Sequence, residues 1–146
     1  CIYQNMRGKE ISSYTARLDY LFFQHPRTVG IGDGGNEIGM GNLVAHIPGI
    51  ATLPREPAVA KVTHLVIASV SNRAAYALVA AHTLHTGKDL LPTPEVEEAA
   101  VRRLVELGAV DGTTAQRRPT VDSFPLEVNR EILERLRRVM RQGTPR

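Results

Sequence analysis

Three polar side chains that could take part in chemistry lie within five consecutive positions of a stretch rich in glycine. Asp33, Asn36 and Glu37 belong to VGIGDGGNEIGMGN, residues 29–42, hereafter the glycine segment, in which six of fourteen residues are glycine. Asp33 and Glu37 are four positions apart, so a helix beginning in this turn would place both carboxylates on one face. Two carboxylates and an amide suit a hard divalent ion such as Mg²⁺ or Mn²⁺, and they equally suit general acid–base catalysis.

Two phosphate-binding alternatives fit the glycine segment less well. Gly30, Gly32 and Gly35 satisfy the dinucleotide pattern G-x-G-x-x-G after a predicted strand. Asp33, however, would place a negative charge in the turn that holds the pyrophosphate, and no Lys or Arg lies in residues 28–54. The same charges oppose a simple phosphate cradle at a helix start. We therefore expect no nucleotide and no pyridoxal phosphate, while a strained turn whose polar groups only cap a helix stays an alternative.

A second polar pair follows the next predicted strand. The run KVTHLVIASV, residues 61–70, is a nearly continuous apolar run, typical of a parallel strand covered on both faces. Ser71 and Asn72 follow it directly, although Ser71 is also interpretable as an ordinary helix N-cap. Ligands in open α/β sheets bind outside the carboxyl ends of the strands, so we expect Ser71 and Asn72 to contact a substrate. Gly34 and Gly35 would join them, because glycine lets a ligand approach the backbone closely.

The remaining pattern predicts alternating helices and strands. In chain order we expect a helix over 11–25 capped near Ser13 or Thr15, a strand over 27–33, a helix from residue 37, a strand over 61–70, and helices over 73–86, 95–107 and 126–141. This alternation indicates an α/β fold, with a mixed or mainly parallel sheet flanked by helices and incomplete at its N-terminus. We expect residues 1–146 to form a single domain.

Apolar spacing predicts which face of each late helix is buried. In the helix over 95–107 these residues are Val96, Ala100, Leu104 and Leu107. In the final helix they are Val128, Ile132, Leu136 and Val139, with Glu131–Arg135 and Glu134–Arg138 as outward ion pairs. Gly87 and Gly108 follow two of the helices and predict where they end.

Composition excludes several classes of protein. The chain has 146 residues, of which 42% are hydrophobic and 23% are charged, values that fit one globular domain. No apolar run approaches the roughly 20 residues of a membrane helix, and no signal-peptide pattern opens the chain. The net charge of +3 argues only weakly for nucleic acid, and the single cysteine cannot form an internal disulfide. Cys1 without a preceding methionine indicates a longer protein that was cut here, rather than a processed cysteine nucleophile.

The glycine segment resembles the signature of a known family. GIGDGGNEIGMGN is similar to the signature of the D-glutamate cyclase C-terminal domain. YQNMRGKEIS and TARLDYLF resemble the part before it, and ASVSNRAAYALVAAHTL resembles the family's Ser-Asn motif with its following helix. LGAVDGTT and PTVDSFPLEVN are similar to bacterial members near their C-terminus. The resemblance spans nearly the whole chain and implies an N-terminal half outside it, since family domains are longer.

The resemblance implies a lyase that dehydrates D-glutamate and closes it to 5-oxo-D-proline. The α-amine attacks the γ-carboxyl group, so the site must deprotonate the amine, neutralise the carboxylate and protonate the departing oxygen. A carboxylate base can do the first, and a Lewis-acid metal can do the second. By this hypothesis Asp33 and Glu37 are metal ligand and base in either order. Asn36, Ser71 and Asn72 would hydrogen-bond the substrate or the developing oxyanion.

Two other functions stay open. The same carboxylates could hold Mg²⁺ in a phosphate hydrolase, or the fold could bind a ligand without chemistry. The expected partners are a small amino-acid substrate and the N-terminal remainder of the domain, with a homo-oligomer left open. Neither nucleic acid nor membrane is expected. The expected location is the cytoplasm in a bacterium and the mitochondrial matrix in a eukaryote.

Overall fold

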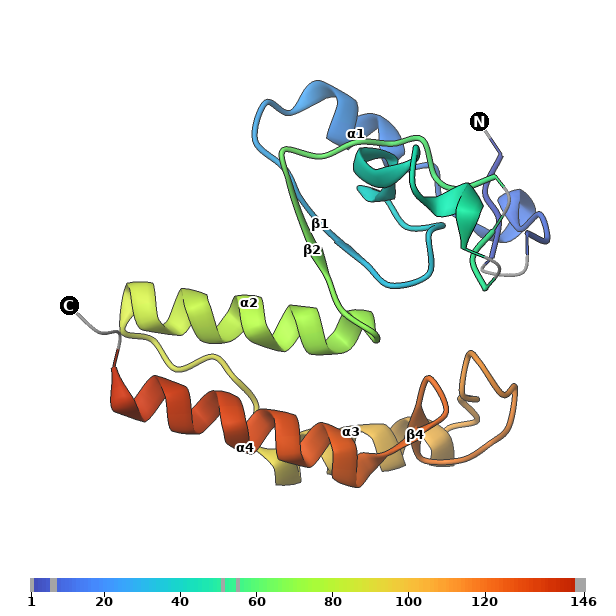
Figure 1. Ribbon diagram of the computed structural model, residues 1–146. Coiled ribbons are helices and arrows are strands. Elements are labelled where there is room, and N and C mark those ends of the chain that lie inside the picture. Colours follow the sequence, from blue (N-terminus) through green and yellow to red (C-terminus); the bar gives the residue numbers. More distant parts are fainter. Residues whose placement is uncertain (1, 6–7, 51, 55, 144–146) are drawn as a thin grey trace. The chain divides into compact units, whose positions relative to one another are not determined.

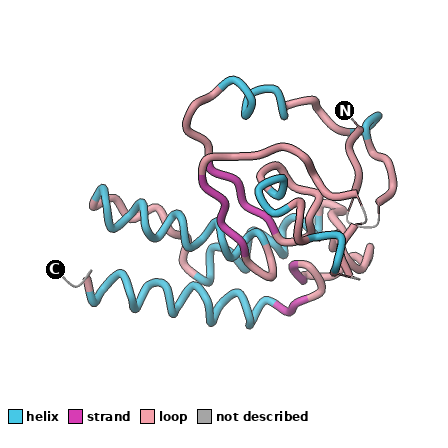
Figure 2. The backbone as a smooth tube through the Cα atoms, turned by 45° about the horizontal axis from the view of Figure 1, so that its top comes forward, coloured by secondary structure: helices cyan, strands magenta, loops and turns pink. Residues whose placement is uncertain are grey.

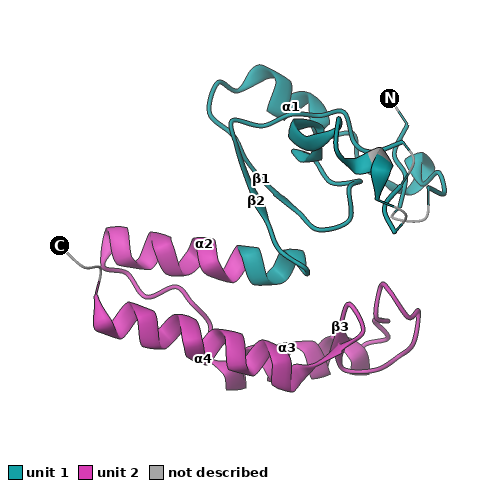
Figure 3. Cartoon of the chain, in the orientation of Figure 1, with its two compact units in different colours: residues 1–74 teal, residues 75–146 magenta. Residues whose placement is uncertain are grey.

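The chain divides into two compact units, residues 1–74 and 75–146, which are described in turn (Figure 3). The structure, a computed structural model, describes residues 2–5, 8–50, 52–54 and 56–143. A small parallel sheet, a small antiparallel sheet and several helices confirm the mixed α/β class. That residues 1–146 act as a single domain stays a prediction. None of the helices in the described ranges is long and apolar enough to cross a bilayer.

The first unit contains a two-stranded parallel sheet. Strand β1 is Val29–Gly32 and β2 is His64–Ile67, with Gly30 opposite Leu65 in the register (Figures 1 and 2). Both strands lie inside the predicted ranges, and their parallel pairing is also as predicted. The prediction that β2 is covered on both faces is wrong, because its two end residues are exposed and its middle residues are half-buried. A sheet of two strands offers little apolar surface to a covering layer.

The helix predicted over residues 11–25 is interrupted. Its first part is the short 3₁₀ helix η1, Ser12–Tyr14, and its last part is α1, Asp19–Gln24. Thr15 between them has an extended backbone, and its hydroxyl donates to a carbonyl group four residues earlier (3.0 Å). No side chain caps the start of α1, so the expected cap is wrong, whereas the end before Pro26 is confirmed.

The helix predicted from Glu37 onward is replaced by two short 3₁₀ helices, η2 at Met40–Leu43 and η3 at Ile47–Gly49. Gly39, just before η2, has a left-handed backbone (φ 107°), which interrupts a regular α-helix. Its amide donates to the carbonyl oxygen of Ala60 at 2.9 Å. The Gly39 amide is therefore bonded to the part of the chain that leads to β2. It is not available for the hydrogen bond that a regular α-helix would need.

Three helices build the second unit. Helix α2, Ser71–Thr86, starts in the first unit, and α3, Pro94–Glu106, and α4, Leu126–Gln142, follow it. Their ends lie within two residues of the predicted ones, and Gly87 and Gly108 follow α2 and α3 with left-handed backbones. The buried core consists of Ala80, Leu91 and Leu133, against which partly buried side chains pack: Tyr76, Val79, Leu136 and Met140.

Asp111 organises the loop between α3 and α4. Its carboxylate accepts hydrogen bonds from the amides of Thr114 (2.8 Å) and Ser123 (2.9 Å) and from the hydroxyl of Thr120 (2.7 Å). Burial opposes the charged form, but these hydrogen bonds prevail and hold the pKa of Asp111 well below its usual value. The loop closes with two short antiparallel strands, β3 at Thr120–Val121 and β4 at Phe124–Pro125.

Helix α3 turns a different face to the core than its apolar spacing predicts. The four residues expected inside are all exposed: Val96, Ala100, Leu104 and Leu107. Glu97 is instead only 7% exposed. Its Oε1 accepts hydrogen bonds from the hydroxyl of Tyr76 (2.8 Å) and from Nδ2 of Asn129 (3.1 Å). The prediction of the buried face is therefore wrong, because polar contacts occupy the inner side of α3.

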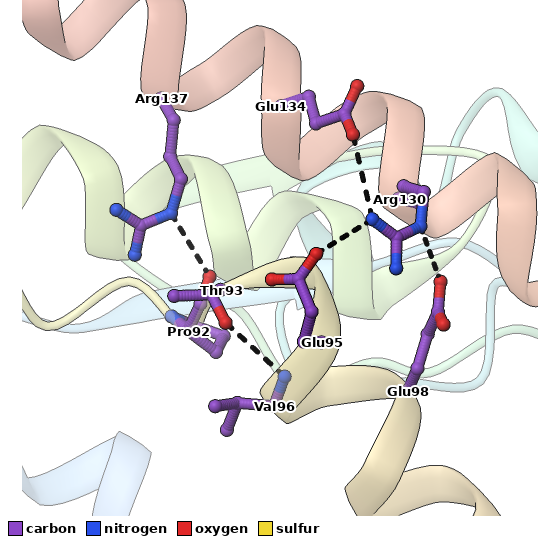
Figure 4. Close-up of polar contacts among 8 residues, drawn as sticks. All are labelled: Pro92, Thr93, Glu95, Val96, Glu98, Arg130, Glu134 and Arg137. Carbon is purple, nitrogen blue, oxygen red and sulfur yellow. Dashed lines mark hydrogen bonds and ion pairs between the residues drawn. The ribbon is translucent and has the colours of Figure 1, made fainter.

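Arg130 of α4 adds a second set of polar contacts to α3 (Figure 4). Its Nε donates to Glu98 at 2.7 Å, and its Nη1 donates to Glu95 at 2.8 Å. These hydrogen bonds lower the pKa of both glutamates and raise that of Arg130. The hydroxyl of Thr93 caps α3 by accepting from the amide of Val96 (3.3 Å). Together the contacts fix the rotation of α3 about its own axis.

Helix α4 follows its predicted pattern in part. Three of the four apolar positions are half-buried, whereas Val139 is exposed and Leu133 is fully buried. The ion pair seen along the helix is Arg130–Glu134 (3.7 Å), rather than either of the two predicted pairs. The arginine that the sequence pattern left unassigned thus connects α4 both to itself and to α3.

Candidate active site

The glycine segment lets the chain cross itself closely. A Cβ atom on Gly30 would lie 2.7 Å from the carbonyl oxygen of Ile38, and one on Gly41 would lie 2.3 Å from that of Val59. Real Cβ contacts are longer than this, so protein backbone already fills the space beside both glycines. At these two positions glycine serves packing within the protein. The crossing fixes the position of the turn at residues 33–37, which follows β1 directly in the chain.

Asp33 stands at the carboxyl end of β1 and contacts the start of α2. Its Oδ2 accepts a hydrogen bond from the amide of Ser71 at 2.6 Å. The first amides of a helix have no partner within the helix, and the helix dipole favours a negative charge beside them. Asp33 therefore caps α2 from a distant part of the chain. Ser71 is the first residue of that helix and not its side-chain cap.

Glu37 folds back over the turn toward Gly34. Its two carboxyl oxygens accept hydrogen bonds from the Gly34 amide, Oε1 at 3.0 Å and Oε2 at 3.2 Å. Burial, and next a hydrogen bond with the Asp33 carboxyl group, raise the pKa of Glu37. Asp33 and Glu37 therefore meet across a tight turn and not along a helix face, and the Asp33 carboxyl group favours the protonated form of Glu37.

A pocket of about 550 Å³ opens in the first unit beside this turn. Asn36 and Glu37 line it, whereas Asp33, Ser71 and Asn72 are not among the described residues of its wall. The wall is formed by four stretches of the chain, which contribute residues within 2–4, 11–23, 36–38 and 56–60. Apolar side chains make up much of it, including Ile2, Ile11, Leu18, Phe23, Ile38 and Val59. Such a mixture of apolar surface and a few polar groups is common in small-molecule sites.

Asn36 ties the turn to the N-terminal stretch of the chain. Its Nδ2 donates to the carbonyl oxygen of Gln4 at 3.1 Å. The side-chain nitrogen of Gln4 in turn donates to the carbonyl oxygen of Glu56, so three parts of the pocket wall are joined. The Oδ1 atom of Asn36 is buried and accepts no hydrogen bond from any residue that is described. A buried acceptor without a donor is costly, and a ligand with an N–H group would satisfy it.

The other predicted contact residues lie around the turn. Gly34 is buried, and its amide is taken by Glu37. Gly35 is buried with a left-handed backbone (φ 85°), and its carbonyl oxygen accepts from the amide of Ala58 at 2.8 Å. Asn72 is exposed on the first turn of α2. A direct contact between substrate and Gly34, Gly35, Ser71 or Asn72 stays a prediction.

Sequence reasoning missed Tyr3 and Asp19, which also line the pocket. The hydroxyl of Tyr3 donates a hydrogen bond to Asp19, and this bond raises the pKa of Tyr3. Sixteen positions separate the two residues, and no local spacing connects either of them to the glycine segment. No sequence signal pointed to these residues, because their contact is created only when the chain folds.

Asp33 and Glu37 supply hard oxygen donors of the kind that Mg²⁺ and Mn²⁺ prefer. Two carboxylates are nevertheless a small set, and the described residues contain no group of three or more His, Cys, Asp or Glu side chains that could hold a metal. Asn36 is the neighbouring amide that could add a further oxygen. A divalent ion bound here would take its remaining ligands from water or substrate, as Mg²⁺ often does.

One comparison with known protein families gives a match. The family described as "D-glutamate cyclase-like, C-terminal" matches residues 2–137. This range contains the glycine segment, the start of α2 and every described residue of the pocket wall. No curated protein matches the chain.

Proposed function

Because the chain belongs to the D-glutamate cyclase-like, C-terminal family, we propose that it is part of a lyase that dehydrates D-glutamate and closes it to 5-oxo-D-proline. The observation that carries this proposal is Glu37, a half-buried carboxyl group with a raised pKa in the wall of a pocket. A raised pKa brings a carboxyl group closer to the pH at which it can both accept and release a proton. The cyclisation requires both.

The reaction moves two protons from nitrogen to oxygen. The ammonium group of the substrate loses protons as its nitrogen attacks the γ-carbon, and the departing γ-oxygen leaves as water. One C–N bond forms and one C–O bond breaks, so the protons lost by nitrogen balance those gained by oxygen. In this proposal the ionised Glu37 takes each proton from the nitrogen and then gives it to the departing oxygen. Asp33 beside it raises the pKa of Glu37 and so favours the protonated form that gives the proton up.

The neighbouring groups have distinct parts in this proposal. Asn36 accepts a hydrogen bond from the amino group of the substrate through its unpartnered Oδ1. Gly34 keeps the Glu37 carboxyl group in place, and Ser71 does the same for Asp33. A divalent ion, if Asp33 and Glu37 hold one, would supply Lewis-acid polarisation of the γ-carboxyl group.

The intact protein tests the proposal directly. It is incubated with D-glutamate, with and without Mg²⁺ or Mn²⁺, and 5-oxoproline is followed by NMR; L-glutamate is the stereochemical comparison. We expect 5-oxoproline to form from D-glutamate, and to form far more slowly in the Glu37→Gln variant. Absence of product under every metal condition contradicts the proposal for this protein. Product formed equally by the wild type and Glu37→Gln contradicts the role of Glu37.

The two rival functions are separated by the same preparation. A metal-dependent phosphate hydrolase would release phosphate from a panel of phosphate esters, a reaction for which the pocket offers no described cationic side chain. A ligand-binding domain without chemistry would bind D-glutamate and return it unchanged. Either outcome would replace the lyase proposal.

A further inference from the structure

The pocket wall holds a carboxylate that the chemistry proposed above does not use. Asp19, the first residue of α1, lines the same pocket as Glu37. Asp33, the carboxylate that the sequence pairs with Glu37, is not among the described wall residues and is engaged by the amide of Ser71. Three carboxyl-bearing residues therefore line the wall: Glu37 and Asp19, which are half-buried, and Glu56, which is exposed.

Asp19 is held in place by Tyr3. The Tyr3 hydroxyl donates a hydrogen bond to the Asp19 carboxylate. Tyr3 itself is anchored through its backbone, because its amide donates to the hydroxyl of Ser12 (2.9 Å) and its carbonyl oxygen accepts from the amide of Ile11 (2.8 Å). A carboxylate that accepts one hydrogen bond from a hydroxyl still has further acceptor sites for a ligand.

Opposite tasks suit the two half-buried carboxyl groups, Glu37 and Asp19. Burial and the contact with Asp33 favour the protonated form of Glu37, so it suits proton transfer. The half-buried Asp19, with its hydroxyl donor, suits the binding of a positive charge. The wall also contains Asn36, whose buried Oδ1 has no donor among the described residues. An ammonium group has three N–H donors and would satisfy such acceptors together.

We propose that Asp19, oriented by Tyr3, binds the amino group of the substrate in this pocket. The inference rests on the proposed function, and it makes Asp19 a binding residue and Tyr3 a positioning residue. It names the ammonium group as the part of the ligand that the pocket recognises. The distinction from Glu37 is one of role: Asp19 determines whether an amine binds, and Glu37 determines whether it reacts.

The test compares two ligands that differ by the amino group. Binding of D-glutamate and of glutarate, which lacks that group, is measured by calorimetry in the intact protein carrying Glu37→Gln, so that turnover does not interfere. We expect D-glutamate to bind more tightly than glutarate. Adding Asp19→Asn should weaken D-glutamate binding by about 10- to 100-fold, the worth of a hydrogen bond to a charged group, and leave glutarate binding nearly unchanged.

Two further variants keep the test decisive. Tyr3→Phe should reduce the preference for D-glutamate over glutarate by a smaller factor, because it removes the orienting hydroxyl and keeps the carboxylate. Glu10→Gln is the matched control: it removes one negative charge from the same part of the chain at an exposed position outside the described pocket wall, and the preference should persist. Circular dichroism checks that each variant is folded.

The outcomes separate this inference from the proposed function. A preference for D-glutamate that survives Asp19→Asn, or its absence while Asp19 is intact, overturns the inference. If Asp19→Asn does not fold, the Tyr3→Phe comparison decides in its place. If the wild-type protein forms no 5-oxoproline but Asp19→Asn removes the amine preference, the lyase proposal fails and the amine site stands.

Discussion

Glu37 combines, in one side chain, the burial, the carboxyl partner and the pocket that proton transfer requires. Its pKa is raised first by burial and then by the hydrogen bond with Asp33. Because its oxygens also accept from the Gly34 amide, the carboxyl group is held in one orientation toward the turn. A fixed proton carrier with a raised pKa is the arrangement that general acid–base catalysis uses.

Replacing Glu37 by Gln should abolish most of the proposed activity. Gln keeps the size and one oxygen acceptor but cannot carry a proton, so we expect turnover of D-glutamate to fall by about 100-fold or more. The 5-oxoproline assay measures this, with thermal unfolding as the control for folding. Retention of more than about a tenth of the wild-type rate, a loss well below the roughly 100-fold expected of a proton carrier, would speak against the assignment.

Asp33→Asn tests the carboxyl pair separately. It removes one of the influences that raise the pKa of Glu37, so that pKa should fall while the effect of burial remains. The limb of the pH–rate profile that reports Glu37 should therefore move to lower pH. The start of α2 loses a charged cap as well, at a cost of about 1 kcal/mol in unfolding free energy. A profile that stays in place would mean that Asp33 does not influence Glu37.

At the scale of the elements, α3 shows how polar contacts can override an apolar pattern. The leucine-bearing side of the helix faces outward, while Glu97 is buried beside Tyr76 and Asn129. Arg130 adds charged contacts to Glu95 and Glu98 on the α4 side. The helix orientation goes with these polar contacts, although Oε2 of Glu97 and Oδ1 of Asn129 are buried without a hydrogen-bond partner among the described residues.

A pair of leucine substitutions measures this orientation. Leu104→Gln, on the exposed side, should change the unfolding free energy by no more than about 0.5 kcal/mol. Leu133→Ala, at a position with no exposed surface, should cost about 3 kcal/mol. Urea denaturation of the two variants gives the comparison. A large loss in Leu104→Gln would show that something covers this side of α3 in solution.

Elements with strong local signals could be predicted from the sequence. The two parallel strands, the three long helices and the glycines that end α2 and α3 all follow from runs of residues close in the chain. The absence of a regular helix after Glu37 could not be predicted from neighbouring residues. The amide of Gly39 is bonded instead to the carbonyl oxygen of Ala60, more than twenty positions away. The buried face of α3 depends likewise on Arg130 and Asn129 of another helix.

The residues of the candidate site likewise differ in how well the sequence predicts them. Asp33, Asn36 and Glu37 stand out locally, since their residue types are unusual among glycines, and the structure brings Asp33 to Ser71 as well. Tyr3 and Asp19 carry no such local signal. Their place in the pocket depends on how the N-terminal stretch folds over the turn, which periodicity and spacing do not encode.

For the whole molecule, the carboxyl groups with shifted pKa values differ between the two units in the direction of the shift. In the second unit Asp111, Glu95 and Glu98 have lowered pKa values, so they stabilise the fold above the unfolded-state pKa and lose that contribution as pH falls below about 4. Glu37, in the first unit, has a raised pKa, so protonation in acid relieves the cost of burying its charge.

Acid should therefore affect the second unit first. We expect heteronuclear amide NMR spectra, recorded from neutral pH down to about pH 3, to lose dispersion for residues 75–143 before residues 29–42. Asp111→Asn should lower the unfolding free energy at neutral pH by on the order of 3 kcal/mol and flatten its dependence on acid. Simultaneous loss of both sets of signals in the wild type would contradict the assignment of acid sensitivity to these groups.

The close crossing of the chain at Gly30 and Gly41 has a consequence for how related sequences are interpreted. These glycines are required by backbone packing, so selection would retain them in any protein that keeps the fold, active or not. The run of glycines therefore indicates a shared fold, whereas the residue at position 37 indicates whether the protein is active. A relative with every glycine in place but a different residue at that position should fold normally and leave D-glutamate untouched.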